Sequence, residues 1–196
     1  MTGRPPAPPL DETIERCLPV VQRLHRRIRD GVLAACRTTA SDELAAVAGN
    51  EGGDTVYAVD RVGEALLLEE LGREAEALGG VVLVAEGLAE GALPLPLGSD
   101  AEAARYRVIV DPIDGTRGLM YQKRSAWVLT GVAPNCGQFT SLSDIVLAVQ
   151  TEIPLVKQYL VDELSAVRGG GVVAERHDVV SGRVVPMVLR PSSAET

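Results

Sequence analysis

The stretch Val108-Ile109-Val110-Asp111-Pro112-Ile113-Asp114-Gly115-Thr116 carries most of the information about fold and chemistry. Its apolar start predicts a buried strand, and two aspartates three positions apart follow in a turn that contains proline. Pro112 fixes its own φ, and Gly115 allows a phosphate to approach the backbone closely. The N–H groups of Gly115 and Thr116 would open a helix whose N-terminus favours an anion. Since Mg²⁺ prefers hard oxygen ligands, the two carboxylates beside this turn predict a Mg²⁺ bridge to a phosphate.

Helical patterns precede this stretch, and strand patterns surround and follow it. Asp11 is the predicted cap of a first helix whose apolar residues recur every three to four positions up to Ala35. A second helix is predicted over residues 59–78 and ends at Gly79-Gly80. Strands are predicted over residues 55–58, 81–85 (followed by Glu86), 107–110 (followed by Asp111), 126–133, 144–151, 156–160, 166–167, 172–174 and 184–189. Helices followed by a run of strands predict an α+β fold with a helical pair on one face of a largely antiparallel sheet.

Length and charge limit the classes of function. With 196 residues and 46% hydrophobic residues, the chain is long enough to fold as one domain without disulfides. Its net charge of −8 has the wrong sign for a nucleic-acid or anionic-membrane surface, and six aromatic residues offer few stacking platforms for bases. The apolar runs fall far short of the roughly 20 residues that span a bilayer. Residues 1–10 are expected to form a disordered Pro-rich arm rather than a secretion signal, which predicts a cytoplasmic protein.

Several residues have plain structural interpretations. The three cysteines contain no CxxC pair, so neither a zinc site nor a disulfide framework is predicted. His25 and His177 are expected at the surface, and the arginines of the first helix are expected to point at solvent. The glycines at 169–171 lack the Lys and Ser/Thr of a phosphate-binding P-loop and predict a hairpin turn.

The motif Asp111-Pro-Ile-Asp-Gly-Thr116 resembles the signature of the inositol monophosphatase-like family, Mg²⁺-dependent and lithium-sensitive phosphatases that share a fold with fructose bisphosphatase. The segment from Asp54 to Asp60 resembles the family's stretch before its long helix, and 81–86 resembles the strand that ends in a metal-binding Glu. Residues 11–190 follow the family's N-terminal lobe, and residues 191–196 form a tail.

This resemblance implies a set of roles. Glu86, Asp111 and Asp114 would be side-chain ligands of Mg²⁺, and Ile113 would contribute its backbone carbonyl. Asp60 would lie in the outer part of the metal cluster, although it would serve equally as a helix cap. Thr116 would act with Glu86 to orient and deprotonate a metal-bound water, and the amides of Gly115 and Thr116 would hold the phosphate.

The sequence also departs from the family pattern. Glu86 is followed by Gly87 where the family has a second acidic residue, and Arg117-Gly118 replaces the usual Thr-Asn. The family's second lobe carries a Trp-Asp motif, whereas Trp127 precedes Val128 and the chain contains no such motif. The C-terminal lobe is therefore expected to be absent, which would leave an apolar sheet face uncovered and favour a homodimer.

The leading hypothesis is a Mg²⁺-dependent phosphomonoesterase that acts on a small polyol or sugar phosphate, with inositol monophosphate as the first candidate. Fructose bisphosphate and adenosine bisphosphate are the alternative substrates. A hypothesis of a different class is a truncated, non-catalytic module that binds metal or phosphate.

Overall fold

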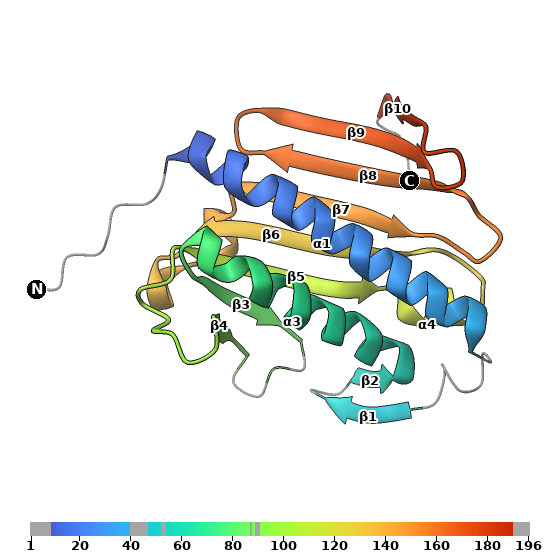
Figure 1. Ribbon diagram of the computed structural model, residues 1–196, viewed down its shortest axis with the longest axis horizontal. Helices are drawn as coiled ribbons and strands as arrows, with labels where there is room; N and C mark the ends of the chain where they lie inside the picture. Colours follow the sequence, from blue (N-terminus) through green and yellow to red (C-terminus); the bar gives the residue numbers. More distant parts are fainter. Residues whose placement is uncertain (1–8, 40–46, 52–53, 87, 89–90, 190–196) are drawn as a thin grey trace, which may run out of the picture.

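The computed structural model describes residues 9–39, 47–51, 54–86, 88 and 91–189. Two long helices, α1 (Leu10–Thr38) and α3 (Ala58–Leu78), lie side by side across one face of an eight-stranded sheet (Figure 1). The sheet consists of β3 (Val81–Ala85), β4 (Leu93–Leu95), β5 (Tyr106–Asp114), β6 (Ala126–Pro134), β7 (Leu147–Ile153), β8 (Leu160–Val167), β9 (Gly171–Asp178) and β10 (Val184–Pro186). A separate hairpin of β1 (Val47–Glu51) and β2 (Asp54–Tyr57) precedes α3.

The strand order is β10-β9-β8-β7-β6-β5-β3-β4. Only the pairing of β3 with β5 is parallel, and the other pairings within this sheet are antiparallel. The α+β expectation of a helical pair on a largely antiparallel sheet is thus confirmed. The parallel pair matters for the site, because it brings the carboxyl ends of β3 and β5 to the same edge of the sheet.

The core lies between the helix pair and the sheet. Leu24, Ile28 and Val32 of α1 are buried at helical spacing against the inward-facing residues of the strands, including Val128 and Leu147. Gly79 ends α3 in the left-handed conformation with φ 85°, as its position after the apolar pattern predicts.

The arginines of α1 do not simply point at solvent, which corrects the sequence expectation. Arg23 Nη2 lies 3.0 Å from Glu74 Oε1, and Arg27 Nε lies 3.1 Å from Glu70 Oε1, so both arginines bridge α1 to α3. Arg26 reaches the sheet instead and pairs with the buried Glu163 of β8. The pattern of charges along one helix cannot reveal that a second helix offers the matching carboxylates.

His25 is fully buried, so the prediction of a surface histidine is wrong. Its Nε2 lies 2.7 Å from Thr130 Oγ1 and its Nδ1 lies 3.0 Å from Thr151 Oγ1. These two hydroxyls belong to neighbouring strands, β6 and β7, and satisfy both ring nitrogens inside the core. Burial lowers the pKa of His25 to about 3, which keeps the ring neutral.

Some element boundaries also differ from prediction. The α1 helix begins at Leu10 after Pro9, not after Asp11, and residues 156–159 lie outside the strands, with a turn at 156–157. Strands β1 and β4 were not predicted. The turn at 168–170 between β8 and β9 agrees with the predicted hairpin turn. Most of the predicted arm (residues 1–8) and the tail lie outside the described residues.

None of Cys17, Cys36 and Cys136 is joined in a disulfide, and Cys136 Sγ donates to the carbonyl oxygen of Pro134 at 3.5 Å. Burial raises the pKa of the Cys17 thiol to about 12, so this group is inert as a nucleophile at neutral pH. None of the described helices combines the length and the apolarity that crossing a bilayer requires.

Candidate active site

The signature motif does not leave the sheet at Asp111 as the sequence predicted, because β5 continues to Asp114. Asp111 is paired with Leu129 and Asp114 with Trp127, so three steps along β5 oppose two along β6. This one-residue excess is a β-bulge. In a regular strand, residues three apart would face opposite sides of the sheet; the bulge restores both aspartates to the face that carries Leu129 and Trp127.

The hydroxyl of Thr116 links the motif to the start of α3. Its Oγ1 lies 2.7 Å from Asp60 Oδ1 and 2.8 Å from the carbonyl oxygen of Ile113. The other oxygen of Asp60 accepts a hydrogen bond from the Tyr57 N–H at 2.8 Å, in the manner of a capping box. Asp60 therefore caps α3 with one oxygen, from the third helical position, and receives Thr116 with the other; its part in a metal cluster stays a prediction.

Four carboxylates gather around the bulge. Burial raises the pKa of Asp111 above its ordinary value, the N–H of Ile113 lowers it by donating to Oδ1 at 3.1 Å, and the charges of Asp114, Glu86 and Asp60 raise it further. Glu86 directly follows β3, the parallel neighbour of β5, and this pairing explains how it reaches Asp111. The structure thus brings Asp60, Glu86 and Asp114 within electrostatic range of Asp111.

This donor set fits Mg²⁺. Carboxylate oxygens and a main-chain carbonyl are the ligands that the ion prefers, and a cation among four carboxylates would remove their mutual repulsion. The side chains do not form a compact triad, however: over the described residues, three potential ligand atoms come within 4.8 Å of one another at Glu163, Glu175 and His177 instead. Mg²⁺ tolerates such spacing because it usually keeps several waters as ligands.

Gly115 follows the bulge with φ 92° and precedes α4 (Thr116–Met120). This left-handed conformation favours glycine, as the turn chemistry predicted. The helix after it has only five residues, so its dipole adds little for an anion. Phosphate binding by the Gly115 and Thr116 amides stays a prediction. It would depend on hydrogen bonds from the two N–H groups and not on the dipole of α4.

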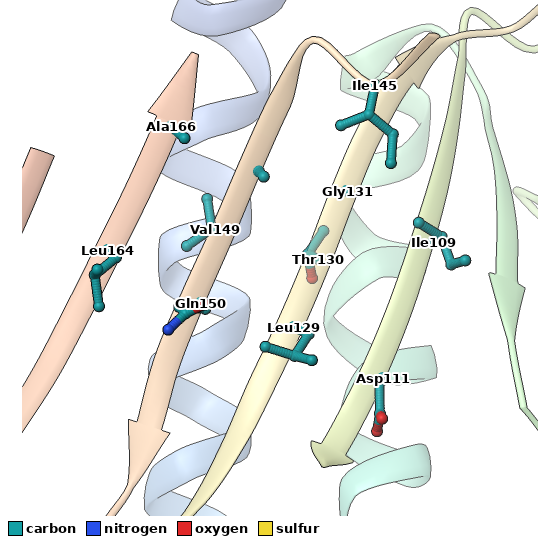
Figure 2. Close-up of a pocket in the computed structure, with 11 residues that line it drawn as sticks. Ile109, Asp111, Leu129, Thr130, Gly131, Ile145, Val149, Gln150, Leu164 and Ala166 are labelled. Carbon is teal, nitrogen blue, oxygen red and sulfur yellow. The ribbon is translucent and has the colours of Figure 1, made fainter. Parts of the chain in front are cut away.

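An apolar hollow of about 380 Å³ adjoins Asp111 on the sheet face opposite the helices (Figure 2). Ile109, Leu129 and Leu164 line it from β5, β6 and β8, and Asp111 stands at one end. Because the lining is almost entirely apolar, the hollow itself does not suit a phosphate ester. Among the described residues no helix like α1 or α3 lies over this hollow, and Ile145 borders it at the end away from Asp111.

One positioning residue was missed by sequence reasoning. Gly63 of α3 faces the motif so closely that a Cβ there would lie 3.1 Å from Ile113 Cγ1 and 3.2 Å from Pro112 Cβ. Gly63 lies in the interior of α3, where glycine lowers helix stability. A glycine at such a position is the feature of the sequence that could have indicated a close contact.

Comparison with known proteins supports the fold and no more specific assignment. No family model and no curated protein matches the chain. Among solved structures, Leishmania major fructose-1,6-bisphosphatase in holo form matches 93% of this chain with a TM-score of 0.63 and 16% identity. The extragenic suppressor protein SuhB of Bartonella henselae matches 81% (TM-score 0.58, 19% identity), and the MJ0109 gene product, an inositol monophosphatase-fructose 1,6-bisphosphatase, matches 80% (TM-score 0.56, 20% identity).

The matches cover 59%, 51% and 51% of those three chains, so the present chain spans little more than half their length. The sheet with its helix pair agrees with the fold that the resemblance in the sequence implies. The chain has the fold of the fructose-1,6-bisphosphatase and inositol monophosphatase enzymes.

Proposed function

We propose that this chain carries the catalytic carboxylates of a Mg²⁺-dependent phosphomonoesterase for a small polyol or sugar phosphate. The observation that carries the proposal is the β-bulge, which sets Asp111 and Asp114 on one face of the sheet beside Glu86 and the Asp60–Thr116 pair. The shared fold with fructose bisphosphatase and inositol monophosphatase supports the same class of substrate.

In this proposal some residues hold the metal ion and others position the attacking water. Asp111, Asp114, Glu86 and the Ile113 carbonyl would hold Mg²⁺, which when bound lowers the pKa of water and neutralises charge on the phosphate. The Thr116 hydroxyl donates toward Asp60 or Ile113, so a lone pair of its oxygen is available to an attacking water; taking a proton from that water would require Thr116 to pass its own proton to the Asp60 carboxylate. Asp60, fixed by the Tyr57 N–H, holds that hydroxyl in place.

The test is phosphate release from a panel of inositol monophosphate, fructose 1,6-bisphosphate and adenosine 3′,5′-bisphosphate, with and without Mg²⁺. We expect Mg²⁺-dependent release from a polyol or sugar phosphate, with inositol monophosphate as the preferred substrate. Asp111→Asn should abolish it, while Asp162→Asn, on the distant strand β8, should leave it unchanged. Release that persists without divalent metal, or in Asp111→Asn, would contradict the proposal.

The open sheet face beside Asp111 favours a second candidate, a module that binds Mg²⁺ without turnover. Calorimetry separates the two. Mg²⁺ binding that depends on Asp111 but is accompanied by no phosphate release would establish the non-catalytic module, whereas turnover on any of the three esters would exclude it.

A further inference from the structure

A second cluster of potential metal ligands lies well away from the signature motif, between α1 and the β8–β9 hairpin. One oxygen each from Glu163 and Glu175 and a ring nitrogen of His177 lie within 4.8 Å of one another. The Glu163 side chain is 2% exposed and that of His177 is 15% exposed, so both belong to the interior side of the sheet. His177 lies in β9, which corrects the expectation of a surface histidine in a turn.

The strand register brings Glu163, Glu175 and His177 to the same face of the sheet. Glu163 of β8 and Glu175 of β9 are directly paired, and His177 follows two residues later on the same face of β9. Two carboxylates directly opposite each other on neighbouring strands repel. The pair is therefore stable only where positive charge stands near it.

Arg26 supplies part of that charge. Its Nε lies 3.2 Å from Glu163 Oε2 and its Nη2 lies 3.1 Å from Glu163 Oε1, and Gln22 Nε2 donates to the same Oε1 at 3.0 Å. These contacts offset one of the two negative charges. They come from the α1 side; Oε1 accepts two of these bonds, whereas Oε2 accepts one and keeps a further lone pair.

His177 gives a second, independent indication of a ligand. Its Nε2 is buried, and over the described residues it has no hydrogen-bond partner. The nearest carboxylate oxygen, Glu175 Oε2, is 3.6 Å away, too far for a hydrogen bond. A buried imidazole nitrogen left without a partner costs stability, and metal coordination would satisfy it.

We propose that Glu163, Glu175 and His177 bind a divalent transition-metal ion, with Zn²⁺ as the ion that suits them best. Two carboxylate oxygens and one imidazole nitrogen are a ligand set that Zn²⁺ accepts at about 2.0–2.2 Å, and the nitrogen disfavours Mg²⁺. A cavity of about 530 Å³, whose lining includes Glu175 and His177 together with Arg26, Arg29 and Asp30, adjoins the cluster and has room for a water as fourth ligand.

The bound ion would tie β8 to β9, with Arg26 of α1 as the outer partner that orients Glu163. A sequence search for cysteine pairs does not detect such a site, because its ligands are set by strand register. The site is separate from the proposed phosphatase centre and does not depend on it.

Calorimetric titration of the whole, metal-free chain with Zn²⁺ tests the proposal. Apart from any Zn²⁺ that binds at the Asp111 cluster, we expect a saturable site whose affinity falls roughly 100-fold or more in His177→Gln and in Glu175→Gln, since even residues that only support metal ligands cost 10- to 100-fold. Zn²⁺ should raise the Tm of the wild type but not that of either variant, and this comparison also shows that the variants fold. Asp162→Asn, which removes a carboxylate from the opposite face of β8, should bind Zn²⁺ as the wild type does.

Two further readouts identify the ligands. Co²⁺ bound in place of Zn²⁺ should give visible d–d bands without thiolate charge transfer, and Asp111→Asn should retain the site. Equal Zn²⁺ affinity in the wild type and His177→Gln would overturn the proposal, and so would a thiolate band or loss of binding in Asp111→Asn. Failure of phosphatase activity would leave all these expectations unchanged.

Discussion

The hydroxyl of Thr116 is the residue-scale feature that most directly links geometry to chemistry. Thr116→Val keeps the shape of the side chain but removes the group that contacts Asp60 and Ile113. If Thr116 relays a proton, kcat should fall about 10²- to 10⁴-fold. The free energy of unfolding should fall by only about 1 kcal/mol, and Mg²⁺ affinity should hardly change.

Thr116→Ser is the matched control, because it restores the hydroxyl without the methyl group. Steady-state kinetics with the best substrate of the panel should show near wild-type kcat for Ser. Equal kcat in the Val and Ser variants would show that the hydroxyl takes no part in the reaction.

His25 makes stability depend on pH. Its folded pKa of about 3 lies below the ordinary value of 6.5, so between these values the unfolded chain binds the proton and the folded chain does not. His25 therefore lowers the free energy of unfolding as pH falls below 6.5, by about 1.4 kcal/mol per pH unit. Urea unfolding at several pH values should show a steeper acid loss for the wild type than for His25→Gln. Parallel curves for the two proteins would contradict the assignment.

At the scale of elements, the contact between α3 and the bulge of β5 depends on Gly63. Alanine should stabilise a helix interior by up to about 1 kcal/mol relative to glycine. At Gly63 the added Cβ crowds Ile113 and Pro112, whereas at Gly72 of the same helix it meets nothing within 4 Å. Chemical denaturation should show Gly72→Ala to be more stable than the wild type and Gly63→Ala to lack this gain.

Gly63→Ala should also weaken Mg²⁺ binding, because the displaced side chains belong to the segment that joins Asp111 to Asp114. Gly72→Ala should leave Mg²⁺ binding unchanged. If both variants gain the same stability and bind Mg²⁺ alike, α3 does not position the bulge.

At the scale of the whole molecule, the main feature is the sheet face opposite α1 and α3, which no helix of comparable length covers among the described residues. Ile109 is 38% exposed there and borders the apolar hollow, whereas α1 and α3 cover the other face. An extended apolar sheet face favours association in water. We therefore propose that the chain forms a homodimer through this face, and sedimentation velocity should show a sedimentation coefficient that rises with concentration.

Ile109→Lys should shift this equilibrium toward the monomer. Leu68→Lys is the matched control, because Leu68 is 39% exposed on α3, on the helix side of the molecule. A monomer at all concentrations, or the same shift in both variants, would contradict association through the sheet face.

The sequence by itself determined the order of elements and the chemistry of the motif. Apolar periodicity marked α1 and α3, and the turn residues marked Gly79 and Gly115, because these signals depend on contacts only a few residues apart. The acidic residues of the motif were identifiable for the same reason. Asp111, Asp114 and Thr116 lie within one short segment, and Glu86 directly follows a clearly apolar strand.

Only the tertiary structure decided how these residues face one another. The bulge that places Asp111 and Asp114 on one face arises from pairing with β6. The ring nitrogens of the buried His25 find their partners in hydroxyls on β6 and β7, more than 100 positions away. Strand register likewise brought Glu163, Glu175 and His177 together. Register and burial result from packing between distant segments, which local sequence patterns do not encode.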